Sequence, residues 1–125
     1  MKVAIISSCC NKPSIKIEDY LPADTTMVIT GGGKGIDVLA EKYAHQKGIP
    51  KLVCPPKMFG RLGKAAIYGL SGFMLAFADR LVAFCFGTGK DDAIQTIAGF
   101  AKSIGKEVAV YSLADKEKRA LVKPV

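Results

Sequence analysis

Short apolar runs alternate with longer helix-like segments along the whole chain. Five runs are typical of strands, because they are apolar, rich in β-branched residues and bounded by glycine, proline or polar residues. They cover residues 2–7, 26–30, 50–54, 80–86 and 107–111. Two longer segments, 34–47 and 91–104, repeat apolar residues at the spacing of a helix with one buried face. A third, from residue 62 or 63 to 78, is apolar on all sides.

The order of these segments predicts the fold class. Strands that alternate with helices indicate an α/β protein with a mostly parallel sheet. We expect one domain over residues 1–125, a three-layer sandwich whose five strands follow the order 3-2-1-4-5, with helices on both faces. The segment 14–22 fits neither period, and residues 112–125 read as a polar carboxyl tail.

The most informative stretch is residues 30–37, TGGGKGID. It lies between an apolar strand and the start of a helix, which is the order of a phosphate-cradling unit. Glycines let backbone N–H groups approach a ligand closely, the helix start adds partial positive charge, and Lys34 adds a full charge. The alternative is a tight turn that needs glycine only for its backbone angles.

A second glycine turn, residues 87–90, follows the fourth strand. In an open parallel sheet, ligands bind beyond the carboxyl ends of the strands, where the strand order reverses. Both turns should reach that edge, so the sequence predicts an anionic ligand, most simply a nucleotide phosphate. The candidate ligand-binding residues are Ser7, Ser8, Gly31, Gly32, Gly33, Lys34, Gly35, Asp37, Lys64, Gly87, Thr88, Gly89 and Lys90.

Acidic residues near the two turns raise the question of catalysis. Asp37 could contact a sugar or a base, or it could be a surface acid favoured by the helix dipole. Glu41 lies one turn further on the same side and could serve acid–base chemistry or a solvated face. Asp91 and Asp92 suit ordinary helix capping. The catalytic residues stay unknown, with Glu41, Asp91 and Asp92 as candidates.

The net charge of +7 favours anionic partners. The basic residues are dispersed, however, and the densest group, at 116–123, contains acids. A nucleic-acid surface more often shows one concentrated basic face, so we expect no nucleic-acid partner. No apolar run is long enough to cross a bilayer and no signal peptide is present, which predicts a cytoplasmic protein without a membrane partner.

Four cysteines occur, Cys9, Cys10, Cys54 and Cys85. Without a signal peptide they should be reduced thiols. No C-x-x-C spacing is present, so we expect no metal site and no cofactor. Cys54 and Cys85 suit small core positions, although a metal or redox site at the strand ends is conceivable; Cys9 and Cys10 suit an exposed loop.

The helix over residues 64–78 has no charged residue after Lys64. A helix that is apolar on all sides must be buried on more than one. One side can pack on the sheet, and a two-fold homodimer is the simplest cover for the other. Coverage by the carboxyl tail is the alternative.

Residues 31–37 resemble the SLOG superfamily, and most closely its cpYpsA-related branch. Further similar segments are 40–44, 48–50, 63–66, 74–75, 78–79, 82–84 and 105–106. The resemblance implies a Rossmann-like fold that senses or processes a nucleotide or nucleotide-derived ligand at the glycine turns. Related branches include the cytokinin-activating phosphoribohydrolases, which cleave a base from a nucleoside monophosphate, and the DprA-type proteins, which bind single-stranded DNA.

The chain departs from the pattern of these branches at three places. Leu70 and Ser71 stand where an Arg-Asn pair is usual, and the arginine often found after the first strand is replaced near Cys9. Asp91, with Asp92 next to it, stands where the phosphoribohydrolases carry glutamate. Binding of a nucleotide is therefore the expected function. Hydrolysis of a nucleoside monophosphate is the first alternative, and binding of single-stranded nucleic acid is the second, although no aromatic residues interleave with basic ones outside the apolar helix.

Overall fold

The computed structural model describes residues 1–7, 15–32, 35–54, 66–86 and 92–113. The strands are β1 (Lys2–Ser7), β2 (Met27–Thr30), β3 (Lys51–Val53), β4 (Arg80–Phe86) and β5 (Glu107–Leu113). The helices are α1 (Ile36–Lys47), α2 (Ala66–Phe77) and α3 (Asp92–Ser103), with a short 3-10 turn, η1 (Ile17–Asp19).

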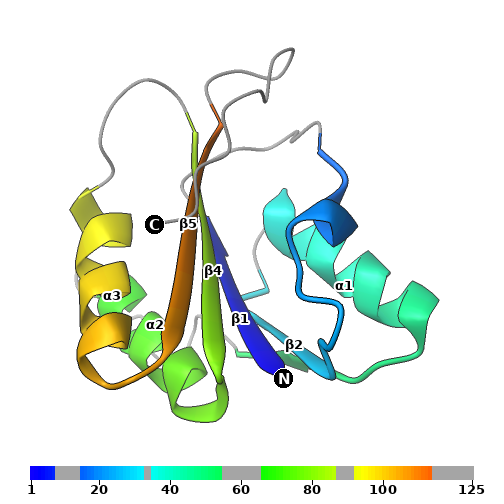
Figure 1. Ribbon diagram of the computed structural model, residues 1–125, viewed down its shortest axis with the longest axis horizontal. Coiled ribbons are helices and arrows are strands. Elements are labelled where there is room, and N and C mark those ends of the chain that lie inside the picture. The colour runs from blue at the N-terminus through cyan, green and yellow to red at the C-terminus, as the bar shows by residue number, and fades with distance from the viewer. Residues whose placement is uncertain (8–14, 33–34, 55–65, 87–91, 114–125) are drawn as a thin grey trace.

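The five strands form one parallel sheet in the order β3-β2-β1-β4-β5. This confirms the predicted α/β class and strand order. Figure 1 shows the sheet nearly edge-on, with α2 and α3 on one face and α1 with η1 on the other. The chain is therefore a Rossmann-like three-layer arrangement, and all five strands end at the same edge.

The core consists of two apolar layers, one on each face of the sheet. In β1, Val3 and Ile5 pack toward α1, whereas Ala4 and Ile6 pack toward α2 and α3. β4 alternates in the same way, and its Phe84 is fully buried on the α1 side. Full burial of such a side chain stabilises the fold by about 1.5–3 kcal/mol. This two-sided burial explains why the central strands read as continuous apolar runs.

The ends of α1 and β5 show where the sequence predicts an element boundary correctly and where it does not. Gly48 ends α1 with a left-handed φ of 68°, directly after the predicted helical segment 34–47. The predicted polar tail from Ser112 is wrong for its first two residues. β5 continues to Leu113, because Ser112 and Leu113 pair with Cys85 and Phe86 of β4.

Two helical glycines face open space among the described residues. Apart from the chain neighbours and the backbone of its own helix, a Cβ atom added at Gly72 of α2 or at Gly99 of α3 would meet no described atom within 4 Å. A glycine within a helix costs about 0.5–1 kcal/mol relative to alanine. Packing among the described residues therefore does not account for either glycine.

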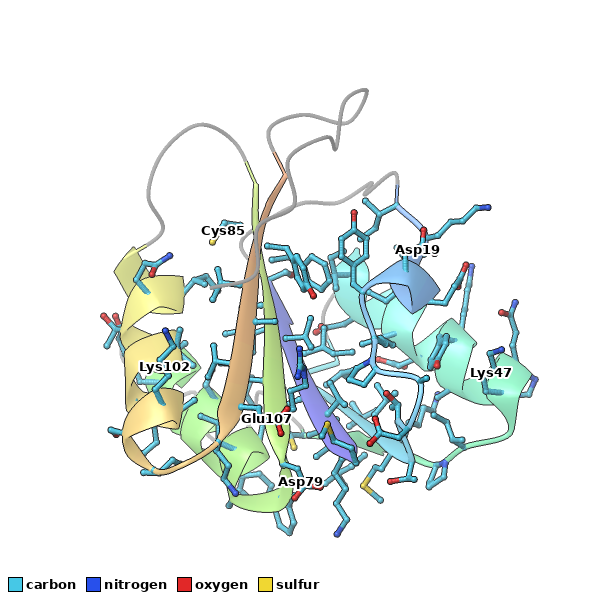
Figure 2. The ribbon with its side chains drawn as sticks, viewed as in Figure 1. Asp19, Lys47, Asp79, Cys85, Lys102 and Glu107 are labelled. Atoms are coloured by element: carbon cyan, nitrogen blue, oxygen red, sulfur yellow. The ribbon has the colours of Figure 1, made fainter. Side chains whose placement is uncertain are left out.

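Polar contacts hold together the amino end of the sheet, where Figure 2 shows Asp79 and Glu107. The Lys2 N–H donates to Asp79 Oδ2 at 2.9 Å, and the Asp79 N–H donates to the Lys2 carbonyl at 2.7 Å. Arg80 Nη1 donates to Glu107 Oε1 at 2.8 Å. These bonds join the first residues of β1, β4 and β5 and set their register.

We predict that Asp79→Ala lowers the free energy of unfolding by about 1 kcal/mol, because the Lys2 N–H loses its carboxylate acceptor. Urea denaturation followed by circular dichroism measures the change. Asp24→Ala is the matched control, since the exposed Asp24 side chain makes no hydrogen bond to a described residue, and it should change little. Equal effects of the two substitutions would contradict the role of Asp79.

Candidate functional site

A small hollow lies at the carboxyl edge of the sheet, between the end of β1 and the turn that follows β2. Its volume is about 90 Å³. We call it the edge hollow. It is lined by Ile5, Ile6, Ser7, Gly31, Asp37, Leu70, Ser71 and Met74. The lining comes from both faces of the sheet, since Asp37 belongs to α1 and the last three residues belong to α2.

Three of the predicted ligand-binding residues meet in the edge hollow, namely Ser7, Gly31 and Asp37. Gly32 and Gly35 lie next to it in the turn between β2 and α1. Asp92, a catalytic candidate, begins α3. The remaining predicted residues lie outside the described part of the chain: Ser8, Gly33, Lys34, Lys64, Gly87, Thr88, Gly89, Lys90 and Asp91.

Side chains of α1 and α2 both approach Gly31, directly after β2. A Cβ atom at this position would lie 3.0 Å from Leu70 Cδ2 and 3.8 Å from Asp37 Oδ2. The first distance is tighter than ordinary van der Waals contact, so a side chain here would require the end of the Leu70 side chain to move by a few tenths of an ångström. Glycine at position 31 therefore leaves room for the Leu70 side chain beside the edge hollow.

Thr30, the last residue of β2, holds the turn between β2 and α1 in place and is completely buried. Its hydroxyl donates to Glu41 Oε2 at 3.2 Å and accepts a long bond of 3.4 Å from the Gly32 N–H. The Gly32 amide thus points back to the strand. Glu41 Oε1 lies 3.5 Å from Lys51 Nζ, so both carboxylate oxygens contact protein groups. These contacts give Glu41 a positioning role between β2, α1 and β3.

Glycine is required at position 32 for two reasons. Its φ of 73° lies in the left-handed region that side chains rarely adopt. A Cβ atom there would also lie 2.9 Å from Val53 Cγ1. The turn after β2 is therefore fixed both by its backbone angles and by the neighbouring strand β3.

α1 begins directly after this turn, at Ile36, and Gly35 is the residue at its N-cap. The Gly35 carbonyl accepts the first helical bond from the Leu39 N–H at 3.2 Å, and no side chain of the described residues caps the helix. The first N–H groups of a helix have no partner within the helix and carry partial positive charge. They occur here at the carboxyl edge, beside the edge hollow.

Sequence reasoning missed the contribution of α2 to this site. Leu70, Ser71 and Met74 line the edge hollow, and Ser71 is only 2% exposed. Its hydroxyl makes no hydrogen bond to a described residue. A signal was available, because Ser71 is the only small polar side chain in an otherwise apolar helix. The sequence analysis did not connect that position with the glycine turn.

Cys54 and Cys85 are buried in the apolar layer between the sheet and the helices α2 and α3. Figure 2 shows Cys85 on the α3 side of β4. Burial raises the pKa of the Cys54 thiol. Within the described ranges, no group of three or more His, Cys, Asp or Glu side chains is arranged to hold a metal ion. Cys9 and Cys10 lie outside those ranges.

None of the described helices is both long enough and apolar enough to span a bilayer.

Strand order, parallel pairing and the position of the edge hollow assign the chain to the class of Rossmann-like α/β proteins. Comparison with family models, with curated proteins and with solved structures finds no match. The SLOG resemblance of residues 31–37 therefore stays a prediction.

We predict that the Thr30 and Glu41 side chains are energetically coupled. In a double-mutant cycle with Thr30→Val and Glu41→Ala, the coupling free energy should be about 1 kcal/mol, the net value of a buried hydrogen bond. The cycle is measured by urea denaturation of the four proteins. Strict additivity of the two single effects would show that the 3.2 Å contact does not stabilise the turn.

We also predict a pH dependence that comes from Cys54. Because burial raises the pKa of the folded thiol above the ordinary value of 9.0, the unfolded state loses this proton first as the pH rises. The stabilising contribution is complete below pH 9.0 and is lost above it. Stability should therefore fall less steeply between neutral and alkaline pH in Cys54→Ala than in the wild type. Parallel stability curves would contradict this assignment.

Proposed function

We propose that the edge hollow and the start of α1 together bind a nucleotide or another phosphorylated molecule derived from one. The observation that carries this proposal is the convergence of Ser7, Gly31 and Asp37 in one hollow at the carboxyl edge of a parallel sheet. Ligands of open α/β sheets bind at this edge. The proposed activity is binding, as in a protein that senses or processes such a ligand.

The phosphate belongs at the start of α1 in this proposal. The helix begins at the carboxyl edge without a side-chain cap from the described residues, and such a terminus attracts anions. The net charge of +7 adds a general attraction for them. Lys34, Lys64 or Lys90 would neutralise the phosphate, as the sequence predicts.

The sugar belongs in the edge hollow, whose chemistry differs from that of a phosphate site. Asp37 contributes a carboxylate, which repels an anion but accepts hydrogen bonds, and Ser7 and Ser71 contribute hydroxyls. These groups suit the hydroxyls of a ribose. A volume of about 90 Å³ is well below the usual range for whole small-molecule sites, so the base lies outside the hollow.

The SLOG resemblance supports this proposal, since it implies a nucleotide-derived ligand at the same turn. No observation on the described residues favours either alternative. Both oxygens of Glu41 are occupied by contacts with Thr30 and Lys51, which does not suit acid–base catalysis. We therefore propose binding ahead of hydrolysis of a nucleoside monophosphate and ahead of binding to single-stranded nucleic acid.

Thermal-shift and calorimetric titrations with a nucleoside monophosphate, the matching nucleoside and inorganic phosphate test the proposal. The monophosphate should bind most tightly, because it alone engages both the helix start and the edge hollow. Ser7→Ala should weaken its binding by about tenfold, the effect of one lost hydrogen bond.

Ser103→Ala is the matched control, because it removes a hydroxyl that bonds only within α3. Its affinity for the monophosphate should equal that of the wild type. The proposal fails if no nucleoside monophosphate stabilises the wild-type protein at millimolar concentration, or if Ser7→Ala and Ser103→Ala bind equally well. Release of free base during the titration would instead favour the hydrolase.

A further inference from the structure

Three aromatic rings contact one another on the α1 face of the sheet. They belong to Tyr20, Phe84 and Tyr111, and we call them the aromatic cluster. The rings of Phe84 and Tyr111 are stacked, with centroids 5.7 Å apart and an angle of 29° between their planes. Tyr20 stands edge-on to both rings, with its centroid 5.3 Å from that of Phe84 and 5.0 Å from that of Tyr111. Aromatic rings attract one another in these arrangements, which fixes the geometry of the cluster.

Burial changes across the aromatic cluster. Phe84 is completely buried and belongs to the apolar layer between the sheet and α1. Tyr20 and Tyr111 pack against this layer but remain partly exposed. A tyrosine ring suits such a boundary, because its body is apolar and its hydroxyl is polar. The cluster therefore continues the aromatic packing of the core out to the surface of the molecule.

The strand register places the aromatic cluster beside the edge hollow. Ser7 lines the edge hollow and pairs with Phe84 of β4, which in turn pairs with Tyr111 of β5. Because side chains alternate along a strand, Ser7 points to the same face as Ile5, which is the α1 face. Ser7, Phe84 and Tyr111 thus form one row across three neighbouring strands. Tyr111 lies about 10 Å from Ser7, which is two strand spacings.

η1 brings Tyr20 to the same end of the sheet. Asp19 is the last residue of η1, and Tyr20 follows it directly. Figure 2 shows Asp19 on the α1 side, level with Cys85 near the carboxyl end of β4, whereas Asp79 marks the opposite end of the sheet. The aromatic cluster, the edge hollow and the start of α1 therefore all lie toward the carboxyl edge.

The order of these three features matches the order of the parts of a nucleotide. The start of α1 follows β2, the edge hollow lies at the end of β1, and the aromatic cluster lies over β4 and β5. These strands are neighbours in the order β2-β1-β4-β5. In a nucleoside 5′-monophosphate, the sugar lies between the phosphate and the base. With the phosphate at the start of α1 and the sugar in the edge hollow, the base extends toward β4 and β5.

We infer that the base of the bound nucleotide stacks on Tyr20 and Tyr111, with the buried ring of Phe84 supporting both. This base site rests on the proposed function, since it completes the phosphate and sugar positions of that proposal. Stacking on aromatic side chains accepts any base, because every base has a π-face. The ligand class is therefore a nucleotide that carries its base, and a bare sugar phosphate should bind more weakly.

Calorimetric titrations of the wild type and of Tyr111→Leu with adenosine 5′-monophosphate and with ribose 5-phosphate test the inference. The wild type should bind the monophosphate about tenfold more tightly than the sugar phosphate, an effect within the range of base–aromatic stacking. Tyr111→Leu keeps an apolar side chain in β5 but removes the ring. It should weaken binding of the monophosphate by about tenfold and leave binding of ribose 5-phosphate unchanged.

Phe77→Leu is the matched control. Phe77 also belongs to an aromatic pair, with its ring centroid 5.3 Å from that of Phe73, but it lies at the end of α2, two residues before Asp79 at the amino end of the sheet. This variant should bind both ligands as the wild type does.

Tyrosine fluorescence gives a second readout, because the chain has four tyrosines and no tryptophan. Adenosine 5′-monophosphate should quench this emission, whereas ribose 5-phosphate should not, since only the base stacks on the rings. The quenching should be smaller in Tyr111→Leu than in the wild type.

The possible failures of the base site and of the proposed function differ. If neither ligand binds to the wild type, the proposed function fails and the base site fails with it. If both ligands bind to the wild type equally well, the phosphate and sugar positions stand and base stacking is overturned. If Tyr111→Leu weakens both ligands by the same factor, Tyr111 acts only through the fold, which also overturns the inference.

Discussion

The edge hollow can form only because β1 lies at the centre of the sheet, between β2 and β4. β1 pairs in parallel with β2 on one side and with β4 on the other, and its two faces are buried by different helices. The chain must therefore deliver α1 to one face and α2 to the other. Both helices reach the end of β1 at Ser7, where the edge hollow forms between them. A different neighbour for β1 would separate Gly31 from Leu70 and abolish the hollow.

α2 lies between two hollows of the described chain. Leu70 and Met74 line the edge hollow, Gly72 and Leu75 line a hollow between α2 and α3, and Ser71 lines both. Burial against the sheet explains part of the apolar character of α2, because Met74 and Leu75 are each only 1% exposed.

Much of the fold could be predicted from local sequence. The bounds of β1 and β4 agree with the sequence prediction, because both strands are apolar on two faces and each starts at a basic residue. The end of β5 could not be predicted, because Ser112 belongs to the strand through its pairing with Cys85 and has no strong strand preference of its own. The strand propensity of a single residue does not determine where a strand ends, because pairing with the neighbouring strand sets its length.

The candidate site was only partly predictable for the same reason. The glycine turn after β2 was visible, because a strand, glycines and a helix start follow one another in the sequence. The closeness of Leu70 to Gly31 was not visible, because these residues are far apart in the chain and are joined only by the packing of α2. The contacts of Glu41 with Thr30 and Lys51 could not be predicted either, because they join three separate elements of the chain.

The most direct test of the central claim is an NMR titration of backbone amides with a nucleoside monophosphate. The account predicts that the largest shifts occur at the edge hollow and the start of α1, at Ser7, Gly31 and Asp37, with little change at the amino end of the sheet around Asp79. Shifts confined to the amino end, or no shifts at saturating concentration, would contradict a ligand site at the carboxyl edge.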